Sequence, residues 1–195
     1  MKWLRFFLWV PILFFSFFQN ATIAQSPVEP IKAKQRKLTY QNQPDGSRIL
    51  KWQETGAFCR SSSGATMNTM GDQSTFIDVQ GNTYNIVHSK KIANFVQRSP
   101  GFIHDMIKKR RPESFQGHKM VNGFECAIGP VLMNGKLSGT DYFYLPYGLI
   151  VKTEVTSPGG SHFIVRELYD IEVAEPDPAL VRIPEGYSIQ NQAVQ

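Results

Sequence analysis

The feature that most constrains this chain is a run of short apolar segments joined by tight turns between residues 66 and 96. Segments of strand length alternate there with turns rich in Gly, Asp, Asn, Ser and Lys, such as Gly81-Asn82. Turns this short pair neighbouring strands antiparallel and leave little room for a crossover helix. The sequence therefore predicts an antiparallel meander over these residues.

Strand signals continue on both sides of the meander. Residues 38–59 predict a hairpin with its turn at Pro44-Asp45-Gly46, and Asn134-Gly135 predicts another turn of this kind. Residues 142–145 are apolar on both faces, as expected of a strand that is covered on both sides. We expect about ten strands in an antiparallel sheet that curls strongly on itself.

The clearest alternation of apolar and polar residues lies in residues 162–173. Pro176 and Pro178 then end this strand, because proline cannot donate a hydrogen bond to a neighbouring strand. We expect residues 179–187 to fold back and close the sheet. Phe163, Val165, Tyr169, Ile171 and Val173 form one predicted face and Arg166, Asp170 and Glu172 the other, while Glu167 interrupts the first face and Ile164 and Leu168 the second.

One segment, residues 99–111, predicts a helix. Ser99 can cap it, Pro100 suits the first helical position, and the positive residues 108–111 suit the negative end of the helix. We expect this helix to cover the sheet. The predicted fold class is therefore mainly β (α+β), a strongly curled antiparallel sheet or half-open β-barrel with one helix across its concave face.

A groove under this helix is the candidate binding site. Aromatic and methionine side chains are more numerous than a thin open sheet needs, so some of them are free to contact an acyl chain or apolar peptide. The alternative is that each is ordinary core. The candidate lining residues are Phe102, Ile103, Met106 and Ile107 on the helix and Tyr142 and Tyr144 on a strand.

The N-terminal residues predict export. Lys2 and Arg5 precede an apolar run at 6–18, and small residues before Gln25 suit cleavage, so residues 1–24 are read as a signal peptide. The alternative, a membrane anchor, needs about 20 apolar residues, more than this run provides. We therefore expect a periplasmic or secreted mature protein that does not span the membrane.

Two further regions follow the predicted signal peptide. Residues 25–37 are polar and proline-containing, which predicts a flexible segment, and residues 38–190 are long enough for a single β-rich domain.

The net charge of the predicted mature chain is small. Cleavage of the signal peptide removes two positive charges and lowers the formal net charge from +5 to +3. A charge this small and dispersed, in an exported protein, argues against nucleic acid as a partner.

Cys59 and Cys126 are the two cysteines of the chain. An even count in an oxidising compartment predicts one disulfide between them. The alternative is a redox or metal-binding pair, which more often has the close spacing Cys-x-x-Cys.

No catalytic, metal-binding or cofactor-binding motif is evident. The histidines at 88, 104, 118 and 162 lack metal-ligand spacing, and neither Gly-x-Ser-x-Gly nor a phosphate-binding glycine loop occurs. We therefore predict no catalytic residues, metal or cofactor.

The C-terminal segments carry a family resemblance. Residues 166–171, Arg-Glu-Leu-Tyr-Asp-Ile, and 175–187, Glu-Pro-Asp-Pro-Ala-Leu-Val-Arg-Ile-Pro-Glu-Gly-Tyr, resemble the end of uncharacterised exported bacterial β-rich proteins. These are distantly similar to the periplasmic outer-membrane lipoprotein carrier and sorting (LolA-like) proteins. The resemblance covers about the last thirty residues closely and 38–155 only in architecture, and Val181 stands where an aromatic residue is usual. It implies a half-open barrel that shelters acyl chains.

Three functions stay open at this point. The first is a non-enzymatic envelope protein that binds a lipid, lipoprotein or other apolar ligand in the half-barrel groove. The second is a structural or interaction module with a filled core, whose partner is another envelope protein. The third is an envelope hydrolase, which a cleft of converging His or carboxylate side chains would support.

Overall fold

A computed structural model of the 195-residue chain describes residues 28–99, 115–133 and 135–191. These residues form one twelve-stranded sheet in the order β12-β6-β5-β4-β3-β2-β1-β11-β10-β9-β8-β7. The strands are β1 (Ile31–Asn42), β2 (Arg48–Arg60), β3 (Thr66–Met70), β4 (Gln73–Ile77), β5 (Asn82–Val87), β6 (Ile92–Arg98), β7 (His118–Val121), β8 (Phe124–Met133), β9 (Lys136–Tyr144), β10 (Leu149–Thr156), β11 (His162–Val173) and β12 (Ser188–Asn191).

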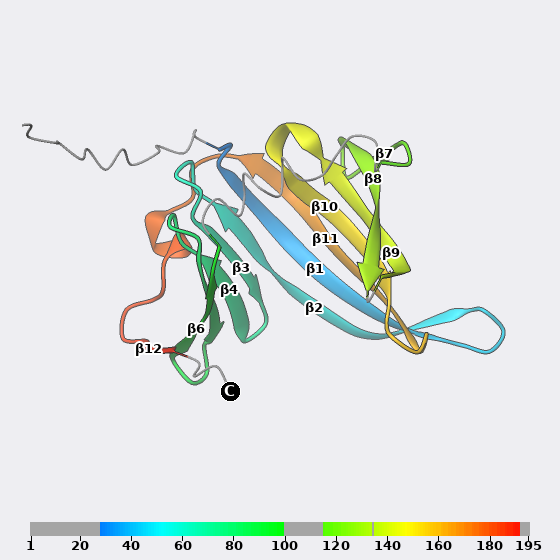
Figure 1. The fold of residues 1–195 in the computed structure, drawn as a ribbon, viewed down its shortest axis with the longest axis horizontal. Helices are drawn as coiled ribbons and strands as arrows, with labels where there is room; N and C mark the ends of the chain where they lie inside the picture. The colour runs from blue at the N-terminus through cyan, green and yellow to red at the C-terminus, as the bar shows by residue number, and fades with distance from the viewer. Residues whose placement is uncertain (1–27, 100–114, 134, 192–195) are drawn as a thin grey trace, which may run out of the picture.

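The mainly β fold class and the predicted meander are confirmed. Strands β2 to β6 pair in sequence order and antiparallel, as do β7 to β11, and only β12 runs parallel to its neighbour β6. Figure 1 shows the long strands β1, β2, β10 and β11 crossing the middle of a strongly bent sheet, with β3 to β6 on one side and β7 to β9 on the other. In the part of the chain that the structure describes, β7 and β12 are the two edge strands of the sheet. They do not pair with each other, so the sheet is curled but open.

The helix predicted over 99–111 falls almost entirely within residues 100–114, outside the described residues. The signal peptide predicted at 1–24 also lies outside them. The described residues contain the short 3-10 helices η2 (Leu145–Tyr147) and η3 (Pro178–Val181). Among them no helix is long and apolar enough to cross a membrane.

The N-terminal segment corrects one prediction, because β1 begins at Ile31, inside the range 25–37 expected to be flexible. The basic residues in that range alternate with side chains that are buried, including Ile31 and Ala33. Lys32 and Lys34 form ion pairs with Glu172 and Asp170 of β11, at 3.3 and 2.9 Å. The composition is that of a solvated coil, but the charges have partners on a strand that lies far away in the sequence.

A bulge in β11 explains why its predicted faces were interrupted. Lys34 is paired with Tyr169 and Lys32 with Glu172, so one residue of β1 lies opposite two of β11, and Asp170 has φ 49°. The extra residue shifts the alternation by one position. Leu168 and Ile171 therefore both pack against the same core cluster, although a strict period of two would place them on opposite faces.

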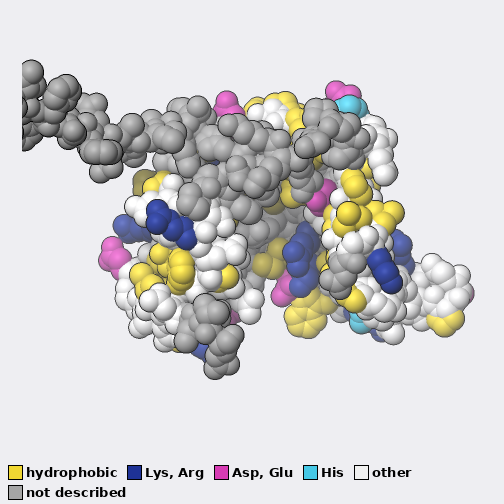
Figure 2. Space-filling model, in the orientation of Figure 1, with side chains coloured by type: hydrophobic (Ala, Val, Ile, Leu, Met, Phe, Trp, Pro, Cys, Tyr) yellow, Lys and Arg dark blue, Asp and Glu magenta, His cyan; other side chains and the backbone are white. Residues whose placement is uncertain are grey.

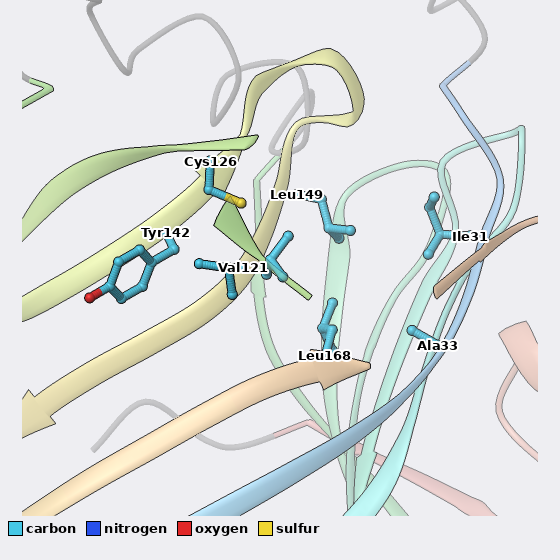
Figure 3. Close-up of a cluster of buried hydrophobic side chains, with 8 residues drawn as sticks. Ile31, Ala33, Val121, Cys126, Tyr142, Leu149 and Leu168 are labelled. Atoms are coloured by element: carbon cyan, nitrogen blue, oxygen red, sulfur yellow. The ribbon is translucent and has the colours of Figure 1, made fainter. Parts of the chain in front are cut away.

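Two core clusters stabilise the two sides of the sheet. The first joins β1, β7, β8, β9, β10 and β11, and Figure 3 shows Val121 between Tyr142 and Leu149 in it. The second lies within β3 to β6 and is built around Met67, Phe76 and Ile86. The tail folds back, as expected, and packs on the second cluster through Val181, Ile183 and Tyr187, but it covers this cluster and does not close the sheet.

β2 passes very close to β3 at Gly56. A Cβ atom on Gly56 would lie 1.9 Å from the Thr69 carbonyl oxygen, so no larger residue fits without separating the strands. The Gln35 side chain lies over this point, and its amide nitrogen is 2.5 Å from the same Thr69 oxygen. Glycine at position 56 therefore permits the close approach of three strands.

We predict that Gly56→Ala lowers the free energy of unfolding by about 1–3 kcal/mol, because the added methyl group forces β2 and β3 apart. Urea denaturation followed by circular dichroism measures this change. Thr55→Ala, at the exposed neighbouring position, is the control and should cost less than about 1 kcal/mol. An unchanged unfolding midpoint for Gly56→Ala would contradict the close approach.

A second prediction concerns the tail. The Tyr187 hydroxyl lies 3.0 Å from His88 Nδ1, and its ring meets the His88 ring edge to face. Tyr187→Phe should lose only the hydrogen bond, about 0.5–1.5 kcal/mol, whereas Tyr187→Ala should also lose the packed ring, up to about 3 kcal/mol in total. Thermal unfolding of both variants checks the order; equal losses would show that the ring does not hold the tail.

Candidate functional site

A cavity of about 350 Å³ lies between the two sides of the curled sheet. Figure 2 shows the molecule hollowed between its two lobes, with Lys and Arg side chains beside hydrophobic ones along the hollow. The apolar part of the cavity wall comprises Phe58, Ile77, Leu149, Ile150, Val151 and Leu168, and its polar part Gln35, Arg60, Thr66, Asn68, Thr75, Thr153, Arg166 and Glu167.

The strand register brings these residues together. Phe58 of β2 is paired with Asn68 of β3, which is in turn paired with Thr75 of β4. On the other wall, Thr153 of β10 is paired with Arg166 of β11. Cross-strand partners point to the same face of a sheet, so the curl of the sheet turns two such rows toward one cavity.

Arg60 is the most buried charged residue of the cavity wall, with 2% of its surface exposed. Its Nε donates to the Glu29 carbonyl oxygen at 3.0 Å, and Nη2 donates to the Tyr147 carbonyl oxygen at 2.7 Å. Burial lowers the pKa of this guanidinium, while the charge of Glu29 raises it. An arginine remains protonated at neutral pH despite such a shift, so a positive charge lies in the wall.

The other charged groups of the cavity differ in exposure. Arg166 is exposed, and no ion pair involving it is seen within the described part of the chain. Glu167 is 9% exposed and forms an ion pair with Arg36, whose guanidinium also lies 5.6 Å from the centre of the Tyr169 ring. The carboxylate of the cavity is therefore neutralised, whereas its two arginines are not.

Of the predicted groove residues, the structure describes Tyr142 and Tyr144. Tyr142 and Tyr144 belong to the first core cluster and are not among the residues that line the cavity. Phe102, Ile103, Met106 and Ile107 lie outside the described residues, so their part in a groove stays a prediction. The sequence analysis missed Arg60, Arg166 and Gln35, and only the apolar neighbours of Arg60 in β2 gave a weak signal of burial.

Tyr142 instead forms a polar cluster beside the core. Its hydroxyl donates to Glu154 Oε2 at 3.1 Å, and Lys152 Nζ lies 2.6 Å from Glu154 Oε1. Burial raises the pKa of Tyr142, and the nearby Glu154 charge adds to this effect. Burial also raises the pKa of Glu154, but the Lys152 ammonium outweighs it, so the net pKa is lowered. At neutral pH the cluster is a protonated phenol against a paired carboxylate, which suits a structural role.

One contact could have supported a hydrolase. Ser74 Oγ lies 2.7 Å from His88 Nε2, in the arrangement of a nucleophile and its base. However, Ser74 is only 3% exposed, and the other ring nitrogen of His88 contacts the Tyr187 hydroxyl, not a carboxylate. Ser74 is also not among the residues that line the cavity, so we assign its contact with His88 to holding the tail. Among the described residues no group of three or more His, Cys, Asp or Glu side chains could hold a metal ion.

The expected disulfide is not seen, because Cys59 and Cys126 are both free and buried. Cys59 lies on β2 and Cys126 on β8, with four strands between them in the sheet order. Neighbouring strands are about 4.8 Å apart, so a bridge requires the curl to bring the two strands face to face. The number of cysteines in the sequence does not tell whether β2 and β8 lie face to face.

Comparisons with known proteins support the fold. No family model and no curated protein matches the sequence. Among solved structures, an uncharacterised conserved protein from Thermus thermophilus is similar, with a TM-score of 0.54 and 9% identity over 87% of this chain and 93% of that chain. At such low identity this likeness shows the fold alone.

Two further solved structures are more distant. A LolA superfamily protein from Nitrosomonas europaea has a TM-score of 0.37 and 8% identity, over 82% of this chain and 93% of that chain. MucB has a TM-score of 0.41 and 12% identity, over 86% of this chain and 62% of MucB. A LolA superfamily protein is thus among the similar solved structures, as the distant resemblance stated from the sequence led us to expect.

The cysteines give a prediction of their own. Burial raises the pKa of Cys126 to about 11, and that of Cys59 is also raised, so both thiols are protonated at pH 8. We predict that neither reacts with iodoacetamide in the folded protein, since the thiolate is the nucleophile. Both should react after denaturation without reductant, as measured by intact mass. A denatured protein that takes up the reagent only after reduction would instead contain the bridge.

Proposed function

We propose that this is a non-enzymatic periplasmic or secreted protein that binds the apolar part of a lipid or lipoprotein in the cavity of its curled sheet. The observation that carries the proposal is the cavity itself. Its volume of about 350 Å³ falls within the range of small-molecule sites, about 300–1,000 Å³. A lining of six apolar side chains with several polar ones among them is typical of such sites.

The alternative functions have less support. A wholly filled interior does not agree with a cavity of this size between the two core clusters. A role as an interaction module with another envelope protein keeps one favourable observation, since Ile49, Leu50 and Trp52 on the β1–β2 hairpin are exposed. Figure 1 shows this hairpin extending beyond the rest of the sheet. Such a contact is compatible with ligand binding in the cavity.

Native mass spectrometry of protein extracted gently from its compartment is the direct test. A lipid or acylated species that remains bound, and that is released on unfolding, would support the proposal. Because a weakly bound ligand is lost during purification, the purified protein should also be titrated with decanol, a neutral apolar ligand. Displacement of a polarity-sensitive dye by decanol then measures binding in solution.

We predict that Ile77→Trp weakens decanol binding at least about tenfold, because the larger side chain fills part of the cavity and each excluded CH2 group is worth about 0.8 kcal/mol. Ile77 is half-buried and lines the cavity. Val79→Trp is the matched control, since Val79 is 50% exposed and lies outside the cavity wall. Equal affinity of both variants and the unchanged protein would place decanol elsewhere.

A further inference from the structure

The charge of the cavity wall is not balanced. Glu167 is the one acidic residue among the described lining residues, and Arg36 neutralises it from outside the cavity. Arg60 and Arg166 have no carboxylate within ion-pair distance among the residues that the structure describes. A cavity built only to hold a neutral apolar chain has no use for two unpaired guanidinium groups in its wall.

Arg60 in particular keeps unused hydrogen-bond donors. A guanidinium carries five N–H groups, and the described residues accept from only two of them, one at Nε and one at Nη2. The two carbonyl oxygens hold the planar group in a fixed orientation, but they do not cancel its charge. Glu29 acts on it at longer range and is itself exposed. The remaining N–H groups thus have no acceptor among the described residues, on a side chain that belongs to the cavity wall.

Polar groups near Arg60 can complete such a site. Thr66 is the cross-strand partner of Arg60, and Asn68 follows two residues later on the same strand. The Asn68 side-chain oxygen accepts a hydrogen bond from Gln35 Nε2 at 2.6 Å, which leaves the Asn68 amide group as a donor. Leu149 and Val151 lie on the opposite wall. Arg60, Thr66 and Asn68 therefore place several donors together on one wall, next to apolar side chains of both walls.

We propose that the ligand of this cavity is an amphipathic anion, whose carboxylate or phosphate binds Arg60 with support from Arg166 while its chain packs on the apolar wall. This inference rests on the proposed function and specifies the ligand class. Charge-assisted hydrogen bonds are about twice as strong as neutral ones, and a planar guanidinium suits carboxylate and phosphate equally. Because the geometry does not choose between carboxylate and phosphate, the experiment includes one ligand with each head group.

The test compares three ligands with the same chain and different head groups: decanoate, decyl phosphate and decanol. Isothermal titration with the full mature chain should give at least about tenfold higher affinity for one or both anions than for decanol. The tighter anion identifies the head-group chemistry. Equal affinity for all three would overturn this inference and leave the proposed function standing, whereas binding of none would overturn both.

Variants locate the head group. Arg60→Gln should lower the affinity for the preferred anion at least about tenfold and leave decanol binding unchanged, and Arg166→Gln should give a smaller loss of the same kind. Arg98→Gln, at an exposed arginine outside the cavity wall, is the matched control for a general loss of positive charge. If Arg60→Gln does not fold, Arg60→Lys keeps the charge with fewer donors, and Arg166→Gln alone still tests the site. Loss of anion and decanol binding together, or no loss in any cavity variant, would contradict the assignment.

Discussion

The pairing of β1 with β11 is the contact on which the rest of the structure depends. It joins two antiparallel meanders, β2 to β6 and β7 to β11, into one sheet, and its partners are between 121 (Gln41 with His162) and 142 (Ile31 with Val173) residues apart in sequence. Three cross-strand ion pairs follow this pairing, from Lys32, Lys34 and Arg36. Pairs as exposed as those of the two lysines contribute about 0–1 kcal/mol each. Their main effect is on register, because a slip by one residue would turn the buried side chains of β1 outward.

The register of this pairing also determines what the cavity contains. Gln35 is paired with Leu168, and the next pair, Arg36 with Glu167, forms the ion pair that neutralises the cavity's carboxylate. The bulge at Asp170 then returns Ile171 to the core. On the other side of β1, Gly56 lets β2 and β3 approach closely, and the Gln35 side chain reaches the Thr69 carbonyl oxygen of β3. The register of β1 thus places Gln35, Glu167 and Leu168 together in the cavity wall.

The sequence predicted the parts of the fold that depend on local signals. The meander, the turn at residues 44–46 and the folding back of the tail follow from alternation and from Gly, Asp and Pro, and all three are present. The start of β1 was missed because its alternating Lys and Arg residues resemble a solvated coil when their partners on β11 are unknown. Arg60 was missed for the same reason, since burial of a single arginine depends on carbonyl groups of Glu29 and Tyr147 that lie far from it in sequence.

The position of Arg60 is easier to explain by ligand binding than by stability. Removing a guanidinium from water costs several kcal/mol, and two main-chain carbonyl groups offset only part of this cost. An apolar residue of similar volume at position 60 would fill the same space without an unpaired charge, and such replacements of buried ions are often neutral or stabilising. A buried arginine in a cavity wall, with N–H groups that lack acceptors among the described residues, suits the anion proposed above, because the cost of desolvation and of orientation has been met during folding. On this argument the curl of the sheet provides the apolar wall, and Arg60 gives that wall its selectivity.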